Sequence, residues 1–65
     1  MTDLDGLPPL LTVAQFAEFF QMSRSWVYRE HRRGRVAFLG AGGQTRIRRS
    51  ELERYLRASE RERVA

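Results

Sequence analysis

The sequence predicts a mainly α-helical domain with a small β-hairpin, in the order helix, helix, hairpin, helix. Two amphipathic stretches separated by a very short turn predict a pair of packed helices. A glycine-rich segment between two short apolar stretches predicts the hairpin. Because the chain has only 65 residues, these elements are expected to share one small hydrophobic core. The order of elements is that of a winged helix-turn-helix, in which the hairpin is the wing.

The first helix is expected at about residues 13–20. Thr12, with Gln15 three residues later, is typical of a capping box. Apolar side chains recur at helical spacing along this stretch, and Leu11 stands where a hydrophobic staple would begin. Met22, in the short turn that follows, is expected to fill the core.

The second helix is expected at about residues 24–33. Ser23 is a residue type that caps helices at their start. Gly34 is the type that ends them in a left-handed conformation. Because the turn between the two helices is so short, they form a helix-turn-helix.

The faces of the second helix differ in character. Val27 and His31 share one face, so we expect Val27 in the core and His31 at its edge with one ring nitrogen hydrogen-bonded. Ser25, Arg29 and Arg32 share the opposite face. Arginine is the usual reader of guanine in the major groove, so this exposed face predicts a DNA-recognition helix.

Two short strands are expected at residues 36–39 and 45–48, joined by a glycine-rich tip over residues 40–44. In the second strand Ile47 is expected to face the core. Its two neighbours then face solvent, because side chains alternate along a strand. Those neighbours are Arg46 and Arg48.

The third helix is expected at about residues 51–58, with Ser50 and Glu53 as another capping box. Its apolar stripe comprises Leu52, Tyr55 and Leu56.

Three segments are expected along the chain. Residues 1–9 form a flexible N-terminal arm, because two adjacent prolines disfavour helix there. Residues 10–58 form the winged-helix domain, and residues 59–65 form a charged C-terminal tail that either extends the third helix or frays.

Composition excludes several classes of protein. The chain has no cysteine and a single histidine, so zinc fingers and disulfide scaffolds are excluded, and no metal or cofactor is expected. The glycines join two strands and lack the lysine of a phosphate-binding loop, so we expect no enzymatic activity. No stretch is apolar enough to span a membrane, and the acidic start differs from a secretory signal. The protein is expected to be cytoplasmic and DNA-associated, without a membrane or small-molecule partner.

The charge is strongly segregated. Residues 24–49 carry eight arginines and one acid, a net charge of +7, whereas the rest of the chain carries −3. Such a basic segment indicates a polyanionic partner, with duplex DNA favoured and an acidic protein as the alternative. The residues expected to contact DNA from the second helix are Arg24, Ser25, Arg29, Arg32 and Arg33, while Tyr28 either contacts DNA or packs against the wing. Those expected from the wing are Gly42, Gly43, Arg46 and Arg48. Trp26 is expected to pack against another element.

Two strings of residues resemble a known family. Ser23–Arg29 and Arg46–Leu52 resemble the excisionase branch of the MerR-like winged-helix domains, and the likeness extends over about residues 10–57. Trp26 stands where a small threonine is usual in that family, and Glu30 and His31 stand where it has two aliphatic residues.

The resemblance implies a phage excisionase in a bacterial host cell. By matching position it also implies DNA contacts from the recognition helix, by Arg24, Ser25, Tyr28 and Arg29, and from the wing, by Gly42, Gly43, Arg46 and Arg48. Such a recombination directionality factor binds repeated sites in attachment DNA cooperatively and head to tail, bends the DNA, and directs a tyrosine-family integrase toward excision. A small phage or mobile-element transcriptional regulator on the same fold is the alternative. A MerR regulator carries a coiled coil and a ligand domain after the third helix, so we expect that sensing is not encoded here.

Overall fold

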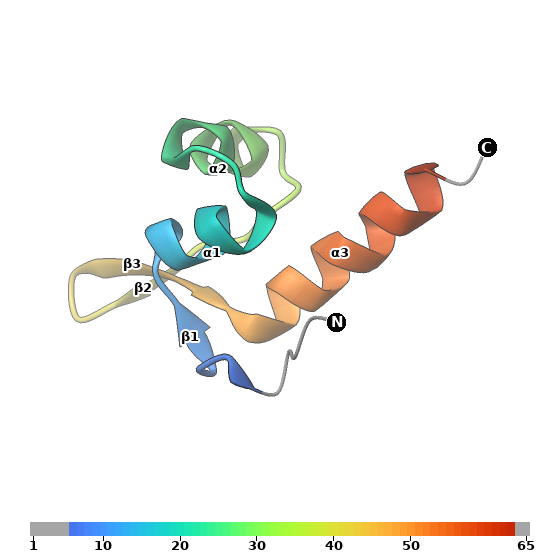
Figure 1. Ribbon diagram of the computed structural model, residues 1–65. Helices are drawn as coiled ribbons and strands as arrows, with labels where there is room; N and C mark the ends of the chain where they lie inside the picture. The colour runs from blue at the N-terminus through green and yellow to red at the C-terminus, as the bar shows by residue number, and fades with distance from the viewer. Residues whose placement is uncertain (1–5, 64–65) are drawn as a thin grey trace.

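The computed structural model describes residues 6–63, which form three helices and a small sheet (Figure 1). This architecture confirms the predicted mainly α-helical winged helix-turn-helix. In chain order the elements are β1 (Leu10–Leu11), α1 (Val13–Phe20), α2 (Arg24–Arg32), β2 (Leu39–Ala41), β3 (Gln44–Arg48) and α3 (Arg49–Arg63).

Helix α1 begins and ends as local chemistry requires. The Thr12 N–H donates to Oε1 of Gln15 at 2.8 Å, and the Gln15 N–H donates to Oγ1 of Thr12 at 3.0 Å. This reciprocal pair confirms the predicted capping box. The helix ends at Phe20, as predicted, and its C-cap Gln21 adopts a left-handed conformation with φ 57° and turns the chain toward α2.

The prediction that Met22 fills the core is wrong. Its side chain is 45% exposed. The Met22 N–H donates to the Ala17 carbonyl at 2.9 Å and thereby closes the end of α1. Phe20 and Trp26 pack together at a centroid distance of 5.8 Å, and both are partly buried against the core.

The sheet has three antiparallel strands in the order β1-β3-β2. Strand β1 was not predicted, because two residues are too few to show a periodicity. The predicted strand at 36–39 is also misplaced, since β2 comprises residues 39–41. Gly42 and Gly43 both have positive φ, 60° and 79°, which permits a two-residue hairpin turn. The strands therefore pair up to that turn, and residues 36–38 are a linker.

Helix α3 starts earlier and ends later than predicted. It begins at Arg49, directly after β3, so the proposed capping box of Ser50 and Glu53 is wrong. The Arg49 N–H instead donates to the Pro9 carbonyl at 2.9 Å. A carbonyl that is distant in sequence thus meets the first N–H of the helix. The helix was expected to end at about residue 58, but it continues to Arg63, so the start of the expected tail extends it.

The expected N-terminal arm lies partly outside the described residues. Of the residues that are described, Leu7 is partly buried against the core. Its carbonyl accepts a hydrogen bond from Nη1 of Arg49 at 3.0 Å. This end of the arm therefore contacts both the core and the start of α3.

The core joins α2 to the sheet and to α3. It takes residues from β1, the three helices, β3 and the linker, so one cluster positions every element except β2, which is held by its pairing with β3. Its members are Leu11, Val13, Phe16, Ala17, Val27, Val36, Ile47 and Leu52. Among residues 6–63, none of the helices combines the length and the apolar content that a bilayer-spanning segment requires.

Candidate nucleic-acid interface

Helix α2 is bounded by the two residues that the sequence indicated. The Trp26 N–H donates to Oγ of Ser23 at 3.2 Å, which confirms Ser23 as the N-cap. Gly34 has φ 78°, and its N–H donates to the His31 carbonyl at 2.9 Å. The helix ends at Arg32, one residue before the predicted end.

Helix α2 buries one face and exposes the other. Val27 is 0% exposed and Glu30 is 3% exposed, and both point into the domain. Five of the six residues predicted to contact DNA lie on the exposed part of the helix, because successive side chains step around the axis by about 100°. They are Arg24, Ser25, Tyr28, Arg29 and Arg32.

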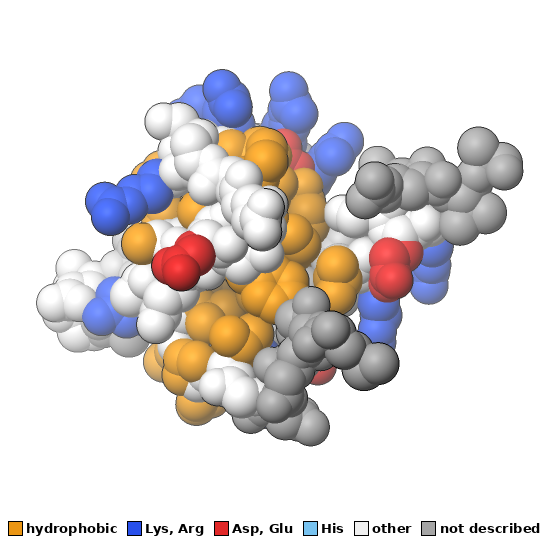
Figure 2. Space-filling model, in the orientation of Figure 1, with side chains coloured by type: hydrophobic (Ala, Val, Ile, Leu, Met, Phe, Trp, Pro, Cys, Tyr) orange, Lys and Arg blue, Asp and Glu red, His pale blue; other side chains and the backbone are white. Residues whose placement is uncertain are grey.

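The edge of α2 that carries Tyr28 and His31 faces the linker that leads into the hairpin. Phe38, the residue before β2, lies edge-on to the Tyr28 ring at 5.6 Å. It stacks on the His31 ring at 3.8 Å with an interplanar angle of 3°. These contacts place the exposed face of α2 next to the segment that leads into the hairpin. Figure 2 shows basic side chains (blue) along the top of the molecule, where Figure 1 places α2.

His31 makes the hydrogen bond expected of it, but from a more exposed position. Its Nδ1 lies 2.8 Å from the Val36 carbonyl oxygen. Because a carbonyl oxygen only accepts, Nδ1 is the protonated nitrogen of this contact. The residue as a whole is exposed, so it covers the linker and is not inserted among the core residues.

The hairpin shows the predicted alternation. Ile47 is 0% exposed, while Arg48 is exposed and Arg46 is half-buried. The Arg46 guanidinium lies along its own strand: Nη1 donates to the Thr45 carbonyl at 2.9 Å, and Nη2 donates to Oε1 of Gln44 at 2.6 Å. Its side chain is therefore held toward the tip of the hairpin.

The two predicted glycines form that tip. Gly42 and Gly43 are exposed, and open space lies where a Cβ of either would stand. Their positive φ values make them the turn itself. The tip therefore presents bare backbone to solvent, with room for close approach to another molecule.

Arg33 differs from the other predicted contacts. It is the C-terminal cap of α2, and its Nη1 lies 3.3 Å from Oε2 of Glu30. Its side chain remains 65% exposed, so the ion pair is partly solvated. The guanidinium is thus turned toward the side of α2 that carries Glu30.

Glu30 is a structural residue that the sequence-based reasoning did not identify. The Tyr55 hydroxyl of α3 donates to its Oε1 at 2.8 Å, and Nη1 of Arg35 lies 3.6 Å from the same oxygen. Burial, together with this hydrogen bond, raises the pKa of Tyr55 to about 12. The available signal was spacing, because Glu30 follows Val27 by three residues and so shares its buried face.

Trp26 packs sideways, as predicted. Its ring lies 5.6 Å from the Tyr55 ring and 6.4 Å from the Phe16 ring. Aromatic contacts therefore hold α2 against both α1 and α3.

The fold and the exposed basic helix define a winged helix-turn-helix domain that binds double-stranded DNA. The helix-turn-helix domain family matches residues 10–60, which is more than half of the chain, and the protein belongs to that family. No curated protein and no solved structure matches the chain.

Proposed function

We propose that the protein is a sequence-specific DNA-binding and DNA-bending excisionase. It binds tandem sites in attachment DNA and directs a tyrosine-family integrase toward excision. The observation that supports DNA recognition most strongly is the exposed face of α2, opposite the buried Val27 and Glu30. The excisionase role rests on the resemblance of Ser23–Arg29 and Arg46–Leu52 to that branch of the family.

The roles we assign along α2 follow from its geometry. Ser25 and Arg29 lie one turn apart on the exposed face and reach base edges in the major groove. Arg24 stands at the first turn, where free backbone N–H groups also favour a phosphate. Tyr28 faces the hairpin side of the groove, and Arg32 contacts the flanking backbone.

Arg33 contributes to the flanking contacts only if it leaves Glu30. Its side chain is 65% exposed, and the buried Glu30 carboxylate keeps Tyr55 and Arg35 beside it when Arg33 leaves. A phosphate oxygen therefore competes readily with the Glu30 carboxylate for this guanidinium.

The hairpin supplies the second contact. Gly42 and Gly43 permit close approach to the sugar–phosphate backbone or to a minor groove, and Arg46 and Arg48 supply charge beside them. Contact by both α2 and the hairpin gives the protein a footprint longer than one groove, which is the arrangement that favours bending.

A binding titration tests the DNA contact. A duplex site is first selected from random sequence, and affinity is then measured by fluorescence anisotropy at several salt concentrations. The logarithm of affinity should fall linearly with the logarithm of salt, as phosphate contacts require. Arg29→Ala should weaken binding by about 1–3 kcal/mol and blur specificity at one base pair. Arg57→Ala removes an exposed arginine of α3 and is the matched control for charge.

Two further measurements separate the excisionase from its alternatives. An excisionase bends attachment-site duplex and stimulates excision by the integrase encoded beside it. A regulator binds a promoter and leaves excision unchanged, and that outcome would replace our proposal. Binding to an acidic protein that is insensitive to added duplex would overturn DNA recognition altogether.

We also propose head-to-tail assembly on DNA. Its motive is the polarity between the basic segment 24–49 and the acidic remainder of the chain. Affinity for two sites in tandem should exceed affinity for one isolated site, and equal affinities would remove this part of the proposal.

A further inference from the structure

The linker between α2 and the hairpin is fixed from the α2 side. His31 Nδ1 donates to the Val36 carbonyl at 2.8 Å, and the His31 ring stacks on Phe38. The Val36 side chain is itself 1% exposed and belongs to the core. The linker is therefore held to the recognition helix by one hydrogen bond, one ring contact and one buried side chain.

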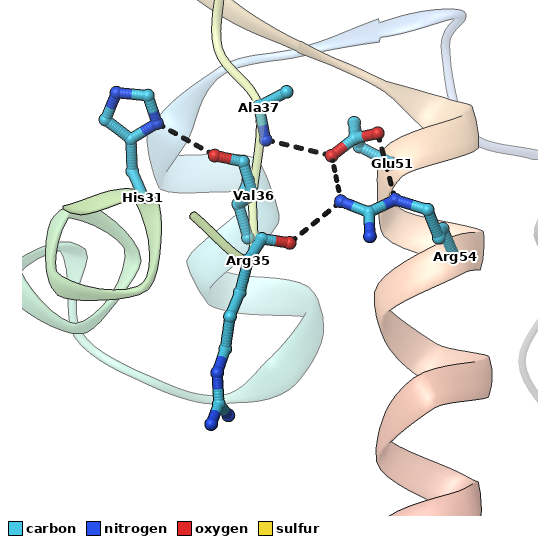
Figure 3. Close-up of polar contacts among 6 residues, drawn as sticks. All are labelled: His31, Arg35, Val36, Ala37, Glu51 and Arg54. Atoms are coloured by element: carbon cyan, nitrogen blue, oxygen red, sulfur yellow. Dashed lines mark hydrogen bonds and ion pairs between the residues drawn. The ribbon is translucent and has the colours of Figure 1, made fainter. Parts of the chain in front are cut away.

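The same linker is fixed from the α3 side, as Figure 3 shows. Oε1 of Glu51 accepts a hydrogen bond from the Ala37 N–H at 2.9 Å. Nη2 of Arg54 donates to the Arg35 carbonyl at 2.9 Å. Two successive side chains on one face of α3 thus hold the backbone on both sides of Val36.

These contacts converge on a single peptide unit. The peptide between Val36 and Ala37 gives its carbonyl to His31 of α2 and its N–H to Glu51 of α3. A planar peptide that is bonded at both ends to two different helices has a fixed orientation. Strand β2 begins two residues later, at Leu39, so this peptide sets the direction in which the chain enters the hairpin. The other strand of the hairpin, β3, pairs with β1 and runs directly into α3.

Glu51 and Arg54 hold each other in place. Nη2 of Arg54 lies 2.7 Å from Oε1 of Glu51, and Nε of Arg54 lies 3.2 Å from Oε2. This forked pair lowers the pKa of the Glu51 carboxyl below its ordinary value, against the opposing effect of partial burial. The carboxylate therefore stays ionised at neutral pH and oriented toward the linker.

We propose that Glu51 and Arg54 are positioning residues, which set the orientation of the hairpin relative to α2 by holding the Val36–Ala37 peptide against α3. The inference rests on the proposed DNA contact by both elements and adds that α3 takes part in it without touching DNA. The effect on DNA binding is exerted through the wing.

Three variants and one control test the inference. Arg54→Met removes the fork to Glu51 and the bond to Arg35 while keeping an unbranched side chain. Glu51→Gln keeps an acceptor for Ala37 but removes the ion pair. Arg54→Lys keeps the charge without the fork and should be intermediate. Arg57→Met is the control, because it removes the same charge from an exposed site on α3. Among residues 6–63, Arg57 makes no hydrogen bond to the linker.

The first measurement asks whether the effect of Arg46→Ala on duplex affinity depends on Arg54. In the unmodified chain, and with Arg57→Met, Arg46→Ala should weaken duplex binding about 10-fold. In the Arg54→Met background the wing is no longer aimed at DNA, so Arg46→Ala should cost about 3-fold or less. If Arg54→Met only lowered stability, the contacts of the folded protein with DNA would be unchanged. The losses of affinity caused by Arg54→Met and by Arg46→Ala would then multiply. Multiplicative effects in folded protein would overturn the inference.

The second readout needs no DNA. Hydrogen exchange at the Ala37 amide should accelerate about 10-fold in Arg54→Met and stay unchanged in Arg57→Met. Residual dipolar couplings of the Gly42 and Gly43 amides should shift relative to those of α2. If Arg54→Met does not fold, Glu51→Gln should show the same changes in smaller amount.

The two proposals fail separately. If the unmodified chain binds no duplex while the hairpin still changes orientation in Arg54→Met, DNA binding falls and the positioning role stands. If duplex binds but the hairpin orientation and the Ala37 exchange rate are unchanged, the positioning role falls and DNA binding stands.

Discussion

The buried carboxylate of Glu30 makes the strongest prediction for stability. Its side chain is 4% exposed, and the hydroxyl of Tyr55 is its shortest contact, at 2.8 Å. Tyr55→Phe removes that hydroxyl and keeps the ring. The ring contacts with Phe20 and Trp26, at 5.2 and 5.6 Å, are therefore retained, and the measured change reports the hydrogen bond.

The expected loss follows from the charge and burial of the acceptor. A hydrogen bond to a charged group contributes about 1.5–3 kcal/mol. Arg33 and Arg35 still face the carboxylate at 3.3 and 3.6 Å, but their side chains are 65% and 51% exposed. They compensate only in part, so we expect a loss of about 1.5–2 kcal/mol in the free energy of unfolding. For a domain of this size the midpoint of thermal unfolding should fall by roughly 6–16 °C.

Urea unfolding followed by circular dichroism measures this loss. Tyr28→Phe is the matched control, because the Tyr28 side chain is 44% exposed and its hydroxyl meets no hydrogen-bond partner among residues 6–63. The control should change stability by about 0.5 kcal/mol or less. A loss for Tyr55→Phe no larger than that of the control would refute the argument.

A double variant identifies the source of the cost. In the Tyr55→Phe background, Glu30→Leu removes the carboxylate that has lost its donor. Replacing both partners by apolar groups of similar shape is nearly neutral, so the double variant should recover part of the stability lost by the single one. A further large loss would mean that Glu30 contributes chiefly through its two arginines.

The remaining predictions concern pH, capping and the wing turn. Because the pKa of Tyr55 is raised, its stabilising effect is complete below about pH 10 and is lost as the pH rises toward 12. Tyr55→Phe should abolish that part of the loss of stability at alkaline pH. An unchanged dependence of stability on pH in this range would contradict the prediction. The pKa of Glu51 is lowered, so its contribution to stability is present at neutral pH and disappears as the pH falls below 4.5. The stability difference between the unmodified chain and Glu51→Gln should shrink at that acidic pH. A difference that does not change with pH would exclude this contribution of Glu51. Thr12→Ala should cost about 0.5–2 kcal/mol in urea unfolding because α1 loses its cap; no loss would show that the cap is dispensable. Gly43→Ala should cost about 1–2 kcal/mol, since φ is 79° there, and a neutral result would mean that the turn relaxes to another type.

The helix boundaries that depend on neighbouring residues were predictable. Thr12 with Gln15, Ser23 and Gly34 act within about four residues of their own positions, so their residue types alone specify the starts of α1 and α2 and the end of α2. The exposed face of α2 was predictable for the same reason, because helical periodicity places Arg29 opposite Val27 whatever surrounds the helix.

The elements that depend on distant partners were not predictable. Strand β1 exists because Leu11 pairs with Ile47, which follows it by 36 positions. The start of α3 depends on the Pro9 carbonyl, which takes the first N–H of the helix. A two-residue strand is too short to show a sequence periodicity, and a single hydrogen bond to a distant carbonyl leaves no sequence pattern.

The candidate site divides in the same way. Arg33 was grouped with the other arginines because charge and spacing do not reveal that Glu30 lies within 3.3 Å. The buried Glu30 and the linker contacts of Glu51 and Arg54 arise where α2, α3 and the linker meet. Capping and periodicity are local interactions, encoded by residue type and spacing. The packing of three segments around one peptide is a property of the folded domain, because it requires side chains that only tertiary contacts bring within hydrogen-bonding distance.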